Sequence, residues 1–272
     1  MLVRAGRRQV VLLWLVGALG LALLSACSAA PHRTAAPGPR PAASGAVVHD
    51  VLGLGDSVTA GSACGCVDFV RLLAHDLSTA SGQPVSSTNR GRPGQTSAQL
   101  LDLVRHDPGV RADVRRADAD VITVGANDLA PALQAWDAGT CDDACAQRDV
   151  AAVTSRVADV VREVRALRVG HPTRVIVTDY WNVFEDGDVG RDDRGTAYLA
   201  WSDRLTRAFN AALCPEVTAA AATCLDLYAP FKGAEGRSDP TGLLADDGDH
   251  PNAAGHALIA RLVLAALTSS PR

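Results

Sequence analysis

The chain has 272 residues, and its 30 Asp and Glu against 26 Lys and Arg give a formal net charge of −4. This mildly acidic balance argues against nucleic acid as a partner, because binding the phosphate backbone needs a basic surface. Aromatic residues make up only 4% of the chain, which argues against a long stacking groove for polysaccharide.

The first 26 residues are typical of an export signal. Three arginines precede a charge-free apolar stretch at residues 10–24, a pattern that predicts a secretory signal. The next residues, Leu-Ser-Ala-Cys at 24–27, resemble the lipobox of bacterial lipoproteins, which implies lipidation of Cys27. Two alternatives stay open. Cleavage within residues 28–30 would release a soluble protein, and an uncleaved segment would be an anchor, although it is short for a span.

We therefore expect a signal peptide at residues 1–26 and a flexible tether at 27–45, which is rich in Pro, Ala, Ser and Gly. Cleavage before Cys27 removes three arginines and no acidic residue, and so changes the formal charge from −4 to −7. The mature protein is expected to be lipid-anchored at the outer face of the cell membrane, or secreted. Residues 46–268 are long enough to bury one core, so we expect a single, monomeric domain.

Six cysteines remain once Cys27 is set aside, and an even number in an exported chain favours three disulfides over a metal site. Their spacings lack the repeated C-x2-C of zinc sites. Sequential pairing is the simplest arrangement, but a bridge within C-x-C closes a tight ring, so pairing of the first two with the middle two stays open. The six are Cys64, Cys66, Cys141, Cys145, Cys214 and Cys224.

Short apolar runs alternate with stretches of helical periodicity along the rest of the chain. The expected strands are residues 47–54, 85–89, 120–124, 174–178 and 223–227, and the expected helices are 67–79, 97–104, 143–169, 196–213 and 252–267. The acidic stretch 186–193 is expected to be a solvated loop. Strands separated by helices indicate βαβ units and a parallel sheet of five strands, an α/β fold.

Polar residues with chemical potential follow the expected strands. They lie in Gly55-Asp56-Ser57, in residues 89–96, in Gly125-Ala126-Asn127-Asp128, and in residues 247–251, which read Asp-Gly-Asp-His-Pro. Ligands of open α/β sheets bind at the carboxyl ends of strands, so these stretches are expected to converge. Each stretch also has a plain structural role open to it, such as capping of a helix by Asp56 or Ser57.

Three of these residues suit nucleophilic catalysis. The hydroxyl of Ser57 needs a base to take its proton, and His250 is the residue type that does so near neutral pH. A carboxylate that accepts from Nδ1 holds an imidazole in one tautomer, and Asp247 lies three residues before His250. A developing oxyanion needs fixed donors, which the backbone N–H groups of Ser57 and Gly94 and the side-chain amide of Asn127 offer.

The four stretches together resemble the blocks of the SGNH (GDSL-type) hydrolases, in the order of that family. The matching residues are Gly55-Asp56-Ser57, Gly94, Gly125-x-Asn127-Asp128 and Asp247-x-x-His250. Gly91, three residues before Gly94, is an alternative for the second block. The resemblance implies a flavodoxin-like three-layer α/β/α sandwich, a catalytic Ser57, an oxyanion hole of Ser57, Gly94 and Asn127, and action on esters without a metal or an organic cofactor.

The residues that would select the substrate are less clear from sequence. Tyr180, Trp181 and Asn182 follow the fourth expected strand, and we expect them to line the acyl or alcohol pocket; packing under the loop is the alternative. The expected function is serine-dependent hydrolysis of a small-molecule or lipid ester. An acyltransferase on the same residues, and a non-catalytic surface-binding lipoprotein, are the other possibilities.

Overall fold

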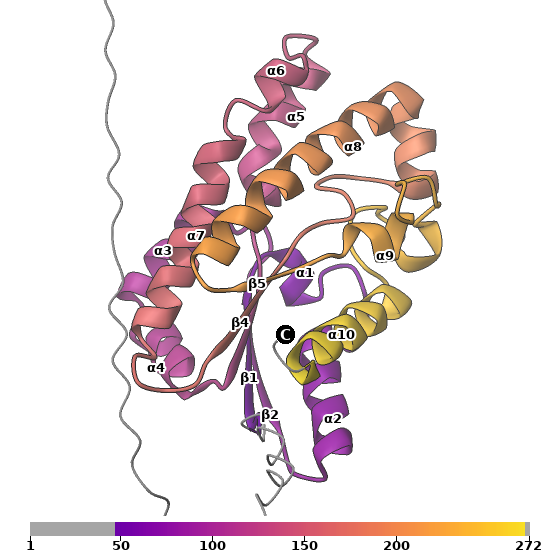
Figure 1. Ribbon diagram of the computed structural model, residues 1–272. Coiled ribbons are helices and arrows are strands. Elements are labelled where there is room, and N and C mark those ends of the chain that lie inside the picture. The colour runs from indigo at the N-terminus through magenta and orange to yellow at the C-terminus, as the bar shows by residue number, and fades with distance from the viewer. Residues whose placement is uncertain (1–46, 270–272) are drawn as a thin grey trace, which may run out of the picture. The chain divides into compact units, whose positions relative to one another are not determined.

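A parallel five-stranded sheet forms the centre of the computed structural model, which describes residues 47–269 (Figure 1). The strands are β1 (Asp50–Gly55), β2 (Ser86–Gly91), β3 (Ala119–Thr123), β4 (Arg174–Thr178) and β5 (Thr223–Leu225). The expected signal peptide (1–26), the tether (27–45) and Cys27 lie outside the described residues, so they stay predictions.

The order of the strands is β2-β1-β3-β4-β5. From β1 the chain moves outward to β2 at the edge and then returns past β1 to β3, so the direction of winding reverses between β1 and β3. A reversal of this kind leaves a crevice at the carboxyl ends of the two strands. The loop that follows β1 therefore lies at the position where open α/β sheets bind their ligands.

Ten helices and two 3-10 turns join the strands within the described residues. They are α1 (Ser57–Ala60), α2 (Phe69–Ser81), α3 (Ser97–His106), α4 (Pro108–Arg116), η1 (Ala126–Leu129), α5 (Ala130–Asp137), α6 (Asp143–Ala146), α7 (Val150–Ala166), α8 (Gly187–Ala219), α9 (Tyr228–Lys232), η2 (Thr241–Leu243) and α10 (Ala253–Thr268).

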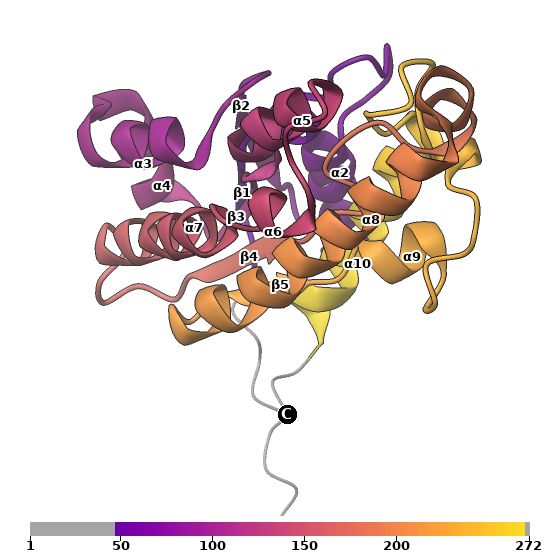
Figure 2. The ribbon, with the colours of Figure 1, turned by 90° about the horizontal axis from the view of Figure 1, so that it is seen from above.

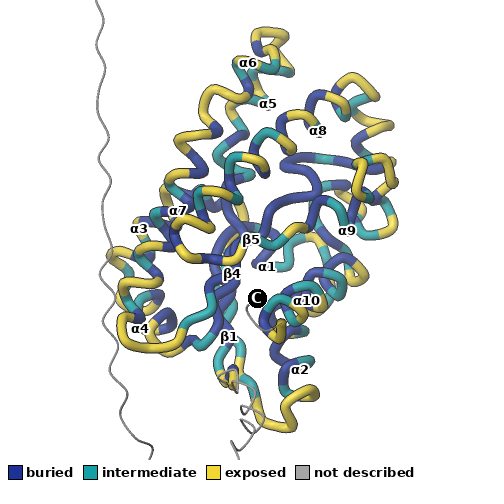
Figure 3. Tube along the Cα trace, viewed as in Figure 1, coloured by how far each residue is buried: buried dark blue, intermediate teal, exposed yellow. Residues whose placement is uncertain are grey.

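The helices cover both faces of the sheet, which confirms the expected three-layer α/β/α fold. Viewed from above, α3, α4 and α7 lie on one side of the strands and α2 and α10 on the other (Figure 2). The three inner strands β1, β3 and β4 are buried almost throughout, whereas the edge strands β2 and β5 are only partly buried and the outward turns of the helices are exposed (Figure 3). Strands covered on both faces need apolar residues on both, which is why they appear in the sequence as continuous apolar runs.

Two expected elements differ in the structure. Residues 143–169 do not form one helix, because Asp142 caps a short helix, α6, and a turn separates it from α7. The acidic stretch 186–193 is not a solvated loop, since it forms the first turns of α8 up to a non-helical backbone at Gly195. The side chain of Asp186 caps this helix by accepting from the backbone N–H of Gly187.

Lys232 is the only lysine of the chain, and its side chain is buried at the end of α9. Its Nζ lies 2.8 Å from Asp186 Oδ2 and 2.8 Å from Asp203 Oδ1. Because an ammonium group is stable in the interior only when paired, these two carboxylates make the burial possible. The cluster joins α9 to the first part and the middle of α8.

The six cysteines of the folded part pair in sequence order, as Cys64–Cys66, Cys141–Cys145 and Cys214–Cys224. The last of these joins α8 to β5. None of the helices between residues 47 and 269 combines the length and the apolar character that crossing a bilayer requires.

Candidate active site

Ser57 is the first residue of α1 and follows β1 after a single intervening residue, Asp56. The chain turns sharply here from strand to helix, because the Asp56 side chain accepts from the Val58 N–H at 3.0 Å and so caps the new helix. This turn leaves Ser57 half-buried at the carboxyl end of β1, in the crevice between β1 and β3.

Asp56 is buried with only 1% of its surface exposed, and three donors hold its carboxylate. Besides Val58, Thr123 of β3 donates its hydroxyl at 2.7 Å, and the Tyr180 hydroxyl after β4 donates as well. Burial raises the pKa of Asp56 above its usual value, although the hydrogen bonds from Tyr180 and Thr123 oppose that rise. The network fixes the residue before Ser57 to two neighbouring strands.

His250 and Asp247 lie on the loop between η2 and α10, and they contact each other as the sequence predicts. His250 Nδ1 is 2.6 Å from Asp247 Oδ2, and the His250 backbone N–H donates to Asp247 Oδ1 at 3.0 Å. Burial works against the charge of Asp247, but the hydrogen bonds from His250 keep its pKa below the usual range. Asp247 thus stays an acceptor, which leaves Nε2 of His250 without a proton and directed to other partners.

Asp249 is a second carboxylate beside His250, which sequence analysis did not single out as functional. Its Oδ2 lies 3.9 Å from His250 Nε2, on the other side of the ring from Asp247. Burial raises the pKa of Asp249 to about 6. Asp249 thus places a second carboxylate next to Nε2 of His250.

Two backbone groups and one side chain are available as oxyanion donors. Within the described residues the backbone N–H groups of Ser57 and Gly94 have no acceptor. Asn127 lies on η1 after β3, and its Nδ2 donates to the backbone oxygen of Gln95 at 3.1 Å. This bond positions the amide against the loop that carries Gly94 and leaves its second N–H available.

The two glycines of the loop after β2 have different roles. A side chain at Gly91 would lie 2.3 Å from the backbone N of Ala60, so this glycine allows the loop to pack against α1, and its N–H already donates to Asn89. Gly94 has a φ of +75°, which side chains disfavour, and open space around its Cα. Its unpaired N–H makes Gly94 the better candidate of the two for an oxyanion donor.

Ser57 and His250 line one small cavity of about 30 Å³, together with residues from the turn after β1, from α1 and η1, and from the loop after β4. No hydrogen bond joins the Ser57 hydroxyl to His250 within the described residues, and such bonds are often long before substrate binds. Buried side chains from the turn after β1 and from the loop after β4 wall this cavity beside Ser57.

Tyr180, Trp181 and Asn182 line this cavity, but most of their surface packs against other parts of the protein. All three are at most 2% exposed. The Trp181 ring stacks on Phe231 with ring centres 4.4 Å apart, and the Asn182 side chain accepts from Thr206 at 3.0 Å and donates to Asp186. These residues form the rigid wall of the cavity. The bond from Tyr180 to Asp56 is a role that sequence analysis missed.

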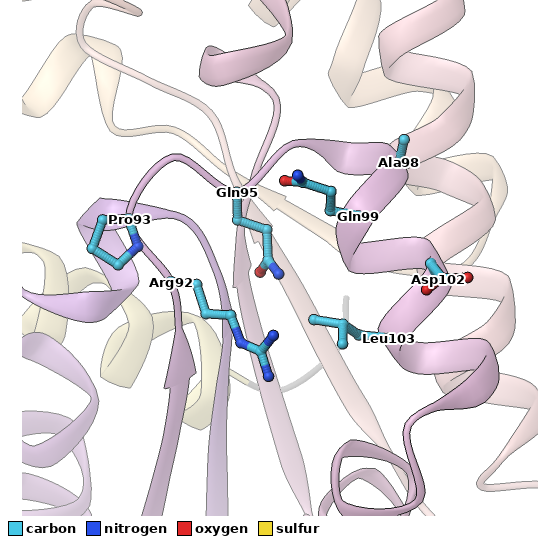
Figure 4. A pocket seen from close by; sticks show the side chains of 7 residues that line it. All are labelled: Arg92, Pro93, Gln95, Ala98, Gln99, Asp102 and Leu103. Carbon is cyan, nitrogen blue, oxygen red and sulfur yellow. The ribbon is translucent and has the colours of Figure 1, made fainter.

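A larger cavity of about 580 Å³ lies between the loop after β2 and α3. The side chains of Arg92 and Gln95 run side by side into it, and Leu103 lies opposite them (Figure 4). Neither Ser57 nor His250 lines it. The loop that contains Gly94 thus separates this cavity from the candidate catalytic residues.

The sequence profile of a known family, described as the GDSL-like Lipase/Acylhydrolase family, matches residues 54–258. This segment begins in β1, just before Ser57, and ends in α10, just after His250. It therefore includes each of the candidate catalytic residues. No curated protein sequence matches the chain.

Several solved structures share the fold. A lipase from a goat rumen metagenome, Lip_vut3, superimposes with a TM-score of 0.67 at 21% identity, over 80% of this chain and 97% of its own. The acetylxylan esterase Axe2 from Geobacillus stearothermophilus gives 0.56 at 19% identity, over 82% and 95%. A lipase/acylhydrolase from Enterococcus faecalis gives 0.53 at 20% identity, over 80% and 95%.

Proposed function

The chain belongs to the GDSL-like lipase/acylhydrolase family and is a carboxylic ester hydrolase, and we propose that it cleaves short-chain acyl esters with Ser57 as the nucleophile. The observation that carries the proposal is the 2.6 Å contact of His250 Nδ1 with Asp247 Oδ2. His250 lines the same cavity as Ser57. The contact provides an oriented base beside a serine that lies just after the end of β1.

The proposed reaction begins when the Ser57 hydroxyl oxygen attacks the acyl carbon and Nε2 of His250 takes its proton. The carbonyl oxygen becomes negative and accepts from the N–H groups of Ser57 and Gly94 and from the Asn127 amide. His250 then gives its proton to the departing alcohol. Water, deprotonated by His250, attacks the acyl-enzyme, and its collapse releases the acid and restores the Ser57 hydroxyl.

The size of the cavity supports a short acyl group. Tyr180, Trp181 and Val183, which are all buried, wall the space beside Ser57 and leave a cavity of about 30 Å³. One of the structures that share this fold is that of an acetylxylan esterase. We therefore propose acetyl esters as the preferred class, with the alcohol outside the cavity.

The test is the hydrolysis of p-nitrophenyl acetate, butyrate and decanoate by the Ser28–Arg272 protein. Ser57→Ala is expected to lose about 10⁴-fold or more in kcat. The matched control is Ser62→Ala, since Ser62 lies just after α1 and its side chain forms no hydrogen bond among the described residues. The acetate ester is expected to react fastest. Equal rates for Ser57→Ala and the unmodified protein would mean that another residue is the nucleophile, and a preference for decanoate would exclude the short-acyl proposal.

We propose further that the protein is exported and is anchored through a lipid on Cys27. The lipobox-like residues 24–27 and the three disulfides, which form in oxidising compartments, support this. Metabolic labelling with a fatty acid should mark the full chain and not its Cys27→Ala variant. Label in both proteins, or in neither, would contradict the anchor. Light scattering of the Ser28–Arg272 protein tests the proposal that it is a monomer.

A further inference from the structure

The loop between α1 and α2 carries Cys64 and Cys66, which are joined to each other and both half-buried. A bridge that closes so short a ring removes little freedom from the unfolded chain, because the entropic contribution of a disulfide grows with the length of the loop it closes. The Cys214–Cys224 pair, by contrast, ties α8 to β5. Stability of the fold is thus a weak reason for the Cys64–Cys66 bridge.

A buried histidine, His256, lies close to this pair of cysteines. His256 of α10 is 0% exposed, and its ring stacks on Phe69 of α2 with ring centres 6.1 Å apart. The backbone N–H of Phe69 donates to His256 Nδ1 at 3.3 Å. Because Nδ1 accepts, the proton of the neutral ring lies on Nε2. Burial lowers the pKa of His256 to about 4, so the ring is neutral at physiological pH.

The N–H of His256 has no acceptor among the described residues, although it is fully buried. A buried donor without an acceptor destabilises the fold, so it calls for an explanation. The two sulfurs of the Cys64–Cys66 bridge lie near this ring: a ring nitrogen of His256 and both Sγ atoms all lie within 4.8 Å of one another. Because Nδ1 already accepts from Phe69, Nε2 is the nitrogen that is free to donate. The sulfur of a disulfide is a poor acceptor, but a thiolate is a strong one.

The charges around the pair also bear on a thiolate. Cys66 lies just before α2, whose N-terminus favours a negative charge. Asp68 caps that helix and disfavours a second negative charge, but Arg71 offsets it through a contact of 2.6 Å. Burial has the largest effect on the pKa of His256 itself, which the charge of Asp68 raises and that of His250 lowers.

We propose that Cys64–Cys66 is a thiol–disulfide exchange site, in which the Nε2–H of His256 donates to the cysteine thiolate that forms on reduction. The bridge is then a reversible modification site that reacts with dithiols, either small molecules or a protein with two neighbouring cysteines. In the reduced state the thiolate thus accepts a hydrogen bond from the Nε2–H of His256, which has no acceptor while the bridge is intact.

The proposed exchange has two steps. One thiolate of the dithiol attacks Sγ of either cysteine, a mixed disulfide forms, and the other cysteine leaves as the thiolate that His256 stabilises. The second thiol of the reagent loses its proton and attacks the mixed disulfide, which releases the reagent as its own disulfide. Two electrons pass from the dithiol to the pair, and the two thiol protons of the reagent end on the cysteines or in solvent.

The first test is stepwise reduction of the folded Ser28–Arg272 protein with dithiothreitol, followed by alkylation with iodoacetamide and mass spectrometry. Cys64 and Cys66 are expected to be labelled at least tenfold faster than the other four cysteines, which serve as internal controls. Reduction of the three pairs at similar rates, or of Cys64–Cys66 last, would overturn the proposal.

The second test is the pH dependence of alkylation once this pair is reduced. The faster-reacting thiol is expected to titrate below the usual pKa of about 8.5, and His256→Phe is expected to raise that value by about one unit or more. Phe keeps the ring packing and removes the Nε2 donor; it also removes the Nδ1 acceptor of the Phe69 N–H, so a thermal melt of the variant accompanies the titration. His75→Phe, at an exposed position of α2, is the control and should leave the thiol pKa unchanged.

Two results would exclude the role given to His256. One is a thiol pKa in the unmodified protein at or above about 8.5. The other is tight binding of one Zn²⁺ by the reduced protein that is lost in His256→Phe, because zinc needs an unprotonated Nε2 and would reassign the proton to Nδ1. If His256→Phe does not melt cooperatively, the rates and the pKa of the unmodified protein decide the proposal alone.

Discussion

The hydroxyl of Tyr180, after β4, donates to the buried carboxylate of Asp56, the residue immediately before Ser57. The two residues are 124 positions apart in the chain. Since β1 and β4 lie on either side of β3, the bond spans the crevice in which Ser57 lies. It is thus a direct link between the wall of the acyl cavity and the turn that presents the nucleophile.

Tyr180→Phe should therefore destabilise the fold. The substitution removes one donor from a buried carboxylate, and leaving such a group short of a partner costs about 1–3 kcal/mol. Tyr198→Phe is the matched control, because the buried Tyr198 hydroxyl has no partner among the described residues and its loss should be neutral or favourable. Urea denaturation of both variants measures the difference. Equal free energies of unfolding for the two would contradict the role of the Tyr180 bond.

Asp247→Asn should abolish most of the activity without unfolding the protein. An amide N–H in place of the carboxylate would face Nδ1 of His250 and favour the tautomer with its proton on Nε2, so we expect a loss of about 10⁴-fold in kcat. Asp246→Asn tests the neighbouring, exposed carboxylate and should retain the rate of the unmodified protein. Steady-state kinetics on p-nitrophenyl acetate decide the matter, and a comparable loss in Asp246→Asn would reassign the acid.

Asn127→Ala tests the oxyanion donors. Removing one such donor costs about 10²–10³-fold in kcat, because the bond forms fully only in the transition state. KM should change little for the same reason. If KM rises while kcat stays constant, Asn127 binds the ground state and is not an oxyanion donor. A thermal melt of the variant shows whether loss of the bond to the Gln95 oxygen also loosens the loop.

Asp179 makes the stability of the fold depend on pH. Its Oδ1 accepts from the backbone N–H groups of Leu227, at 2.6 Å, and of Tyr228, at 3.2 Å, while burial raises its pKa from 3.8 to about 7. A pKa that is higher in the folded state favours folding at low pH. The free energy of unfolding should therefore fall by up to a few kcal/mol as pH rises from about 4 through about 7.

The corresponding variant is Asp179→Asn, which keeps an acceptor oxygen and carries no charge. Its free energy of unfolding, relative to that of the unmodified protein, should rise between about pH 4 and pH 7, as measured by urea denaturation at each pH. Curves that run parallel for the two proteins over this range would show that Asp179 does not titrate there.

The inner strands β1, β3 and β4 could be predicted from sequence because they are buried and stand out as apolar runs between turn residues, whereas β2 at the edge is polar and only partly buried and gave a weaker signal. The expected strand 174–178 has the observed bounds, and the others agree to within a few residues. Helices α1 and α5 were missed, since α1 is a single turn and α5 buries none of its residues and so lacks an apolar stripe. Helix α4 is also absent from the expected elements, although Asp107 followed by Pro108 is a sequence pattern that marks the start of a helix.

The candidate site was predictable in part. Asp247 and His250 are three residues apart, so one loop presents both, and their contact follows from local sequence. The bond from Tyr180 to Asp56 joins residues on different strands and depends on the strand order, which the sequence pattern does not specify. The same holds for Asp249. It is next to His250 in the sequence, and only the structure shows that its carboxylate lies near Nε2, the ring nitrogen that does not contact Asp247. The pairing of the cysteines also needed the structure.

The buried ion pairs of Lys232 leave the described part of the folded chain with no accessible lysine amine. In the protein that begins at Ser28, an amine-reactive dye should therefore attach at the α-amino group alone, giving a uniformly labelled sample without mutagenesis. Lys232 becomes reactive only when α9 separates from α8. The rate at which it acquires a label thus reports how often that part of the structure opens under native conditions.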